Sequence, residues 1–173
     1  MTELKFTFER EKAIEAILYL AGRITDPTLH SIGKLMYFSD KTSLERYGRF
    51  ISGDDYYAMQ WGPVPTHTYD LLKEASRGGA FPFAVQGRSI APSRPADTDL
   101  LSESDIECLD ASIRLYGNAP MWKRHEDSAD RAYKLAWQQR GNSGSARMPI
   151  EEIASLLDDG DDLIDFLANR GSE

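Results

Sequence analysis

A carboxylate interrupts the apolar face of a predicted helix in the stretch "KLMYFSDKTSLERYG". Asp40 follows Met36 by one helical turn, so both side chains point to the inner face. A buried carboxylate without hydrogen-bond donors is strongly unfavourable. Donors follow within about twenty residues, including the hydroxyls of Tyr56 and Tyr57. We predict that the carboxylate forms a structural bracket, with a ligand pocket as the alternative. The bracket comprises the acid, a tyrosine, a tryptophan and a Gly-Pro corner: Asp40, Tyr57, Trp61, Gly62 and Pro63.

The other reactive side chains do not form a catalytic or metal-binding pattern. The sequence contains no GxxxxGK[ST], GxSxG or HExxH motif and no dinucleotide-binding glycine loop. Its three histidines, His30, His67 and His125, have no His or Cys at metal-ligand spacing. The single cysteine, Cys108, lies among apolar residues of a predicted helix, as inert core thiols do. We therefore expect no catalytic residue, no metal site, no cofactor and no enzymatic activity.

The acidic residues are concentrated near the C-terminus. Residues 151–173 hold eight acidic residues against one arginine, a net charge of −7 out of −8 for the whole chain. Apolar residues alternate with these carboxylates, a composition typical of a helix that docks in a groove. A solvated surface, or closure of the domain's own core, is the alternative interpretation. The candidate partner-binding residues are six carboxylates and one aromatic residue: Glu151, Glu152, Asp158, Asp159, Asp161, Asp162 and Phe166.

The elements that position these residues are mostly helices. Apolar periodicity and end signals predict helices over 11–21, 26–48, 65–75, 102–117, 120–140 and, as two short turns, 149–170. The second helix is expected to begin with Asp26 as its N-cap and Pro27 at its first position. The helix over 102–117 opens with a capping box from Ser102 to Asp105. A strand is predicted within 53–61, and a hairpin around Gln86-Gly87.

These elements indicate a mainly α fold: a multi-helix domain with a small antiparallel sheet or hairpin (α+β), which also allows a winged-helix-like topology. Hydrophobic residues make up 41% and charged residues 28% of the 173 residues, as in one soluble globular domain. Residues 1–140 form the main domain, "GNSGSARM" (141–148) is linker-like, and 149–173 form an acidic helical segment packed on the same domain. Without an apolar run long enough for a membrane span or a signal peptide, we expect a cytoplasmic protein.

The central motif resembles the Panacea domain of SocA-type antitoxins and related phage-associated proteins. The family's K-L-x-Y-x-x-D helix matches residues 34–40, its G-x-x-I-[ST] step matches 48–52, its strand matches 57–59 and its G-P-V corner matches 62–64. "LSESDIECLDASIRLYG" is similar to a later helix of the family. Trp122, His125 and Trp137 lie where the family has its closing segment. The resemblance covers about residues 8–140.

The resemblance implies a mainly helical domain that acts as the antitoxin of a two-gene toxin–antitoxin pair. In this family one type of domain accompanies many unrelated toxins and neutralises them by direct binding. SocA itself acts as an adaptor that delivers its toxin to the ClpXP protease. The expected partner is therefore a cognate protein toxin, and the acidic C-terminal segment favours a toxin with a basic surface.

Two other functions stay open at the level of sequence. A winged-helix-like, nucleic-acid-binding regulator would need Lys34, Lys41 and Arg88 to contact phosphates, but the net acidity makes nucleic acid an unfavourable partner. An enzyme would need Asp40 to act together with Tyr57 or His67 in a pocket.

Overall fold

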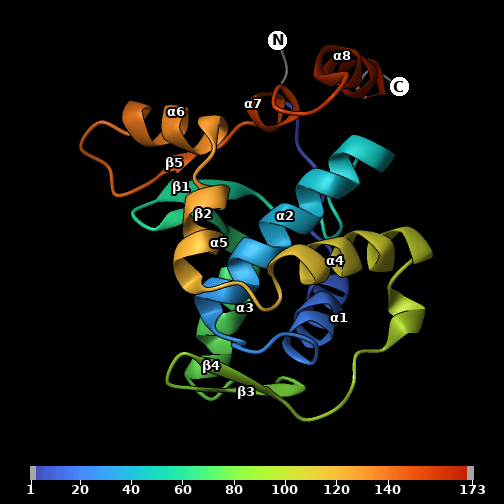
Figure 1. Cartoon of the computed structure of the whole chain (residues 1–173), viewed down its shortest axis with the longest axis vertical. Helices are drawn as coiled ribbons and strands as arrows, with labels where there is room; N and C mark the ends of the chain where they lie inside the picture. Colours follow the sequence, from blue (N-terminus) through green and yellow to red (C-terminus); the bar gives the residue numbers. More distant parts are fainter. Residues whose placement is uncertain (1–2, 171–173) are drawn as a thin grey trace.

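The computed structural model describes residues 3–170, which form eight α-helices and two small antiparallel sheets (Figure 1). The predicted mainly α fold with a small antiparallel sheet is confirmed. The helices are α1 (Arg10–Ala21), α2 (Leu29–Tyr47), α3 (Thr66–Ser76), α4 (Glu103–Tyr116), α5 (Met121–Ser128), α6 (Arg131–Gln139), α7 (Ile150–Ala154) and α8 (Gly160–Arg170). The strands are β1 (Tyr56–Met59), β2 (Gly62–Pro65), β3 (Phe83–Gln86), β4 (Ser89–Pro92) and β5 (Ala146–Arg147), and a short 3₁₀ turn spans Thr98–Leu100.

Helix α2 begins two residues later than the sequence suggests. Its N-cap is Thr28, whose hydroxyl accepts from the Ser31 amide at 3.1 Å, while the Ser31 hydroxyl accepts from the Thr28 amide at 2.8 Å. This reciprocal capping box replaces the expected Asp26 cap. The helix ends as predicted, because Gly48 adopts the left-handed conformation, with φ of 71°.

Two hydrophobic clusters lie on either side of α2. The first joins α2 to α1, α3, α4 and the β3–β4 hairpin, and the second joins it to β1, α6, α7 and α8. In Figure 1, α1 and the hairpin lie below α2, and α6, α7 and α8 lie above it. Since α2 contributes to both clusters, side chains leaving it in different directions can hold separate parts of the chain.

The three-stranded sheet includes part of the segment expected to be a linker. Its strand order is β2-β1-β5, and β5 consists of Ala146 and Arg147, which pair with Ala58 and Tyr57 of β1. The Met148 amide extends the pairing by donating to the Tyr56 carbonyl at 2.8 Å. The linker assignment is therefore corrected at 146–147, where the chain is a strand of the sheet.

The β3–β4 hairpin turns at Gly87 as predicted and lies against the beginning of α2. Gln86 pairs with Ser89, so the loop consists of Gly87 and Arg88. The Leu29 amide donates to the Arg88 carbonyl at 3.0 Å, and the Ile90 amide donates to the Pro27 carbonyl at 2.7 Å. These bonds attach the hairpin to the body of the protein. None of the helices within residues 3–170 has both the length and the apolar composition required to cross a membrane.

Candidate functional site

Asp40 lies at the centre of a closed hydrogen-bonded bracket between α2 and β1. Its carboxylate is fully buried, at 0% exposure. One oxygen, Oδ2, accepts from the Tyr56 hydroxyl at 2.6 Å, and Oδ1 accepts from the Ile51 amide at 2.7 Å. Of the two candidate tyrosines, Tyr56 is the donor, whereas Tyr57, which the predicted bracket contained, lies on the other side of β1. Trp61 is 63% exposed. The donors to Asp40 are thus Tyr56 and Ile51, and neither Tyr57 nor Trp61 belongs to the bracket.

The protonation of Asp40 reflects its complete removal from water. Burial raises the pKa of its carboxyl to about 7, while the bonds from Tyr56 and Ile51 act in the opposite direction. The nearby carboxylates of Asp54 and Asp105 add to the increase. A carboxyl closed in this way is suited to holding α2 against the following segment rather than to meeting a substrate.

Lys34, rather than Asp40, holds the Gly62-Pro63 corner. Its side chain is buried, and Nζ donates to the Pro63 carbonyl at 2.9 Å. Gly62 adopts φ of 115°, and a Cβ at this position would lie 2.6 Å from Nζ of Lys34. The corner therefore requires glycine both for its backbone conformation and for its close contact with the ammonium group. Apolar periodicity does not reveal this residue, since a lysine is usually assigned to the surface.

We expect Gly62→Ala to lower the free energy of unfolding by about 2 to 4 kcal/mol, because it combines an unfavourable φ with displacement of Lys34. Gly87→Ala is the matched control: φ there is 63°, and nothing lies within 4 Å of the added Cβ. The control should lose only about 1 to 2 kcal/mol, the contribution of the left-handed conformation. Urea denaturation of both variants measures the difference, and equal losses would contradict the Lys34 contact.

Asp54 caps helix α3 from a position twelve residues before the helix begins. Its Oδ1 accepts from the amides of Asp55 and His67 at 2.8 and 2.9 Å. Its Oδ2 accepts from the amide and the hydroxyl of Thr68 at 2.9 and 2.6 Å. The sequence contains an indirect signal for this role, because α3 follows Pro65 and has no local capping side chain.

A further bracket joins α2 to α6 through Asp130. Its Oδ2 accepts from the Tyr37 hydroxyl at 2.6 Å and from Nζ of Lys41 at 3.0 Å. Its Oδ1 accepts from the Tyr133 amide at 3.0 Å and so caps α6. With Lys41 paired to Asp130, one of the three cations required by the nucleic-acid alternative is engaged within the protein.

The residues of the enzymatic alternative do not come together either. Asp40 contacts neither Tyr57 nor His67 through the hydrogen bonds of the described residues. His67 instead stacks on Phe8, with ring centroids 4.8 Å apart, and its Nε2 lies 3.4 Å from Oδ2 of Asp55. Within residues 3–170, no three His, Cys, Asp or Glu side chains are grouped so that they could hold a metal ion.

The predicted partner-binding residues separate into two sets. Four of them line a groove of about 470 Å³ between α8 and the end of α2: Asp158, Asp159, Asp162 and Phe166. The others lie elsewhere. Glu151 accepts from the Leu4 amide at 3.2 Å, and Glu152 is exposed on α7. Asp161 lines an adjoining depression that shares Asp159 and Asp162 with the groove.

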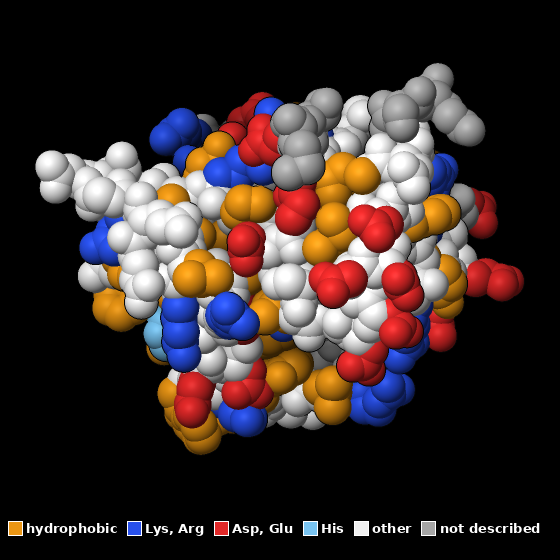
Figure 2. Space-filling model, turned by 90° about the horizontal axis from the view of Figure 1, so that it is seen from above, with side chains coloured by type: hydrophobic (Ala, Val, Ile, Leu, Met, Phe, Trp, Pro, Cys, Tyr) orange, Lys and Arg blue, Asp and Glu red, His pale blue; other side chains and the backbone are white. Residues whose placement is uncertain are grey.

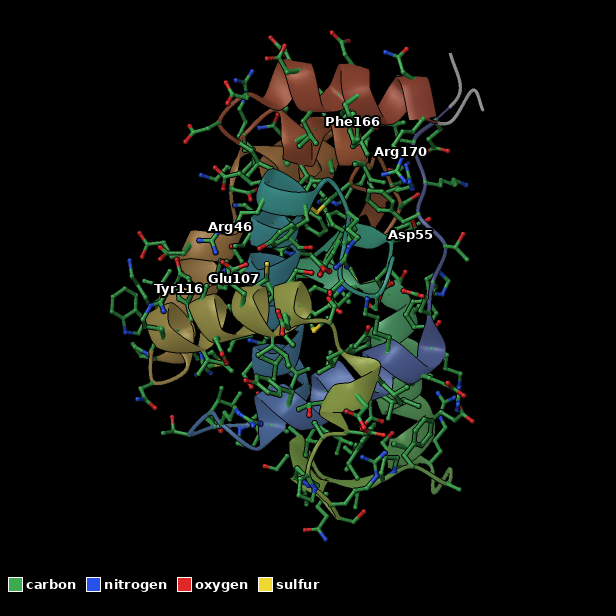
Figure 3. The ribbon with its side chains drawn as sticks, turned by 90° about the vertical axis from the view of Figure 1, so that its right-hand side faces the viewer. Arg46, Asp55, Glu107, Tyr116, Phe166 and Arg170 are labelled. Atoms are coloured by element: carbon green, nitrogen blue, oxygen red, sulfur yellow. The ribbon has the colours of Figure 1, made fainter. Side chains whose placement is uncertain are left out.

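The opposite wall of the groove comes from α2 and was not predicted. It consists of Glu45, Arg46, Tyr47 and Gly48, so a further carboxylate and a second exposed aromatic ring face α8. Arg46 also lines the groove and pairs with Glu107 at 3.0 Å (Figure 3), so the lining holds four carboxylates and one guanidinium. We call this set of residues, with Leu163, the acidic groove.

The acidic groove combines carboxylates with exposed apolar surface. Phe166 is 51% exposed and lies 5.6 Å from the guanidinium carbon of Arg170 on the same helix (Figure 3). Figure 2 shows acidic and hydrophobic side chains intermixed on the face that carries α7 and α8. Apolar rings among side chains that are mostly acidic are typical of a surface that binds a basic protein segment.

Comparison with known proteins gives one match. A family model described as "Antitoxin SocA-like, Panacea domain" matches residues 32–132. The match is shorter than the expected 8–140: it contains the 34–40 helix, the 62–64 corner and His125, but it ends before Trp137. No curated protein and no solved structure matches the chain. The three hydrogen-bonding centres, Asp40, Lys34 and Asp130, lie within the matched residues. The chain belongs to the SocA-like antitoxin family, with a Panacea domain at its centre.

Proposed function

We propose that the protein is an antitoxin that neutralises a cognate protein toxin by binding it directly, without a reaction of its own. Membership of the SocA-like antitoxin family supports the antitoxin role. The observation that carries the mode of action is the acidic groove, which places Asp158, Asp159 and Asp162 around the exposed ring of Phe166. Such a surface suits a toxin segment that is basic and carries at least one apolar side chain.

The acidic wall of the groove lies outside the residues that match the family. Helix α8 begins at Gly160, whereas the match ends at residue 132. The shared domain can therefore be joined to a toxin-contacting element that lies outside it. In this proposal the Panacea domain holds α2 in place, and α8 together with the turn before it adds the charges that select the toxin.

The neighbouring reading frame supplies the direct test of this proposal. Its product, expressed alone in a bacterial host, is expected to arrest growth, and co-expression with the antitoxin should restore growth. The two proteins should also co-purify as a stable complex. Growth arrest that persists on co-expression would contradict the antitoxin assignment.

Delivery of the toxin to a protease is the second mode to be distinguished. Direct inhibition predicts rescue in a host that lacks ClpXP, with the toxin still present at its usual level. An adaptor would instead lose rescue in that host, and the toxin would accumulate. Rescue only where the protease is present would overturn neutralisation by binding alone.

Truncation is a poor way to test the groove. Ile150, Ile153 and Ala154 of α7 are buried in the second hydrophobic cluster, and Leu167 of α8 joins them. A chain shortened before residue 149 would lose core side chains together with the acidic surface. Substitutions on the exposed side of α8 separate the two effects.

A further inference from the structure

A cavity of about 460 Å³ lies away from the acidic groove, between the first half of α2, the β1–β2 turn and the tip of the β3–β4 hairpin. Its walls include His30 and Lys34 from α2, Trp61 from the turn, Tyr69 from α3 and Arg88 from the hairpin. Small-molecule sites in proteins have volumes of roughly 300 to 1,000 Å³. The cavity is therefore large enough for a compact organic ligand.

The charge of this cavity is opposite to that of the chain as a whole. The protein carries a net charge of −8, yet no Asp or Glu is among the residues that line the cavity. The lining contains one lysine, Lys34, and one arginine, Arg88. Clefts lined by charges of one sign concentrate ligands of the opposite sign.

Lys34 has hydrogen-bonding capacity that the protein does not use. Burial lowers the pKa of Lys34 to about 7, so near neutral pH its ammonium form, which has three N–H donors, is present together with the neutral amine. Within the described residues, Nζ of Lys34 has one hydrogen-bond acceptor, the Pro63 carbonyl at 2.9 Å, and forms no ion pair with a carboxylate. The side chain is only 2% exposed, so bulk water does not compensate for the missing partners. An anion in the cavity would supply them.

His30 complements the lysine as a neutral polar group. Burial, and secondly the charge of Lys34, lower the pKa of His30 to about 4. A hydrogen bond to the Trp61 backbone acts in the opposite direction. The imidazole is therefore uncharged near neutral pH and adds no further buried positive charge to the cavity.

Aromatic residues form the remaining functional surface of the cavity. Trp61 is exposed yet held in place, because Nδ1 of His125 lies 2.9 Å from the Trp61 carbonyl and the two rings meet edge to face at 6.2 Å. Tyr69 lies on the α3 side of the cavity. Rings at the mouth of a pocket bind flat ligands by stacking.

We propose that this cavity binds a small organic anion, namely a phosphate or carboxylate group carried on a flat ring. Lys34 and Arg88 hold the charged group, His30 provides an uncharged polar wall, and Trp61 and Tyr69 flank the ring. This ligand site is separate from the toxin-binding acidic groove and does not depend on it.

Calorimetric titration of the full chain tests the proposal with two anions and their uncharged counterparts. Adenosine 5′-monophosphate carries a phosphate and benzoate carries a carboxylate, while adenosine and benzamide carry the same rings without the charge. We expect saturable binding of at least one anion, and binding at least roughly tenfold weaker for its neutral counterpart. The anion that binds identifies which charged group the site prefers. Absence of binding by both anions, or equal binding of the neutral compounds, would overturn the proposal.

Arg88→Gln is the variant that locates the site. The Arg88 backbone carbonyl, which accepts from Leu29, is retained, so the fold should be unaffected. We expect the affinity for the anion to fall roughly tenfold, as for loss of a charge-assisted hydrogen bond. Arg77→Gln, an exposed arginine outside the cavity, is the control and should bind as the wild type does. Unchanged affinity in Arg88→Gln would contradict the assignment.

The same variants separate a ligand site from a toxin contact. If neither anion binds and Arg88→Gln weakens the toxin complex, the cavity is a protein-binding surface and the proposal is wrong. If anion binding is found while toxin neutralisation fails, the ligand site stands and the proposed antitoxin function falls.

Discussion

Asp40→Ala is expected to lower the free energy of unfolding by about 3 to 5 kcal/mol, in the range for breaking a buried polar pair. The substitution removes the acceptor of both the Tyr56 hydroxyl and the Ile51 amide, which lie 2.6 and 2.7 Å from the carboxylate. Tyr56 and Ile51 are themselves buried, so water cannot replace the lost acceptor. Urea denaturation at neutral pH measures the effect, and a loss below about 1 kcal/mol would mean that the bracket contributes little.

Asp40→Asn is the matched control, since it keeps the shape of the side chain and one carbonyl acceptor. We expect a smaller loss, and a different dependence on pH. The pKa of Asp40 is raised from 3.8 to about 7, so between these values the folded state binds more protons than the unfolded state. Rising pH should therefore decrease the wild-type free energy of unfolding relative to Asp40→Asn until about pH 7, and no further above it. An increase over this range would mean that the hydrogen bonds outweigh burial.

The same pair of variants tests whether Asp40 has a role beyond structure. If Asp40→Asn melts like the wild type but fails to neutralise the toxin, the carboxyl takes part in function directly. If neutralisation follows stability in both variants, the bracket is structural. The closed geometry around Asp40 favours the second result.

Features of the fold that depend on neighbouring residues could be predicted from the sequence. The capping box from Ser102 to Asp105 and the hairpin turn at Gly87 appear as expected, because each is determined by a few adjacent side chains. A local signal can still predict the wrong helix start when a second start signal lies next to it in the sequence. Asp26-Pro27 is a common helix start, but the Thr28–Ser31 capping box determines where α2 begins.

Features that depend on distant pairing could not be predicted. Whether Tyr56 or Tyr57 faces Asp40 is decided by the phase of β1, which its pairing with β2 and β5 determines. Strand β5 itself has only two residues in a Gly- and Ser-rich stretch, too few for a period to be recognised. The Lys34–Pro63 bond likewise joins residues 29 positions apart.

In the candidate site, too, the composition of a segment could be predicted from the sequence, whereas contacts between distant segments could not. The acidity of α8 is evident from composition, and so is the presence of Phe166. The other wall of the groove comes from Glu45 to Gly48, more than a hundred residues earlier, and only the tertiary fold brings it opposite α8. The buried faces of α7 and α8, which pack on the second cluster, decide which acidic residues remain available to a partner.

Reversing the charge of the acidic groove is expected to weaken toxin binding by about a hundredfold or more, since like charges across an interface oppose association. The variant is Asp158→Lys with Asp162→Lys. Asp159 is left unchanged because its φ is 56°, a conformation that aspartate tolerates better than lysine. Pull-down and surface binding with the purified toxin measure the loss, which should be largest at low salt.

The control variant changes the net charge of the protein by the same amount, but at positions outside the acidic groove. Glu74→Lys with Glu126→Lys reverses two exposed carboxylates that do not line the groove. It should bind toxin within a few fold of the wild type. Equal weakening by both double variants would mean that overall charge, and not the acidic groove, attracts the toxin.

Phe166→Ala distinguishes the apolar contact of the ring with the toxin from the electrostatic attraction of the groove. The ring is half exposed, so its removal should leave the stability of the fold nearly unchanged. If the ring occupies an apolar pocket of the toxin, its loss should increase the dissociation rate roughly thirtyfold, as for a binding hot spot. Charge reversal should instead act mainly on the association rate and its dependence on salt. A Phe166→Ala variant with wild-type dissociation would place the toxin on another face of the protein.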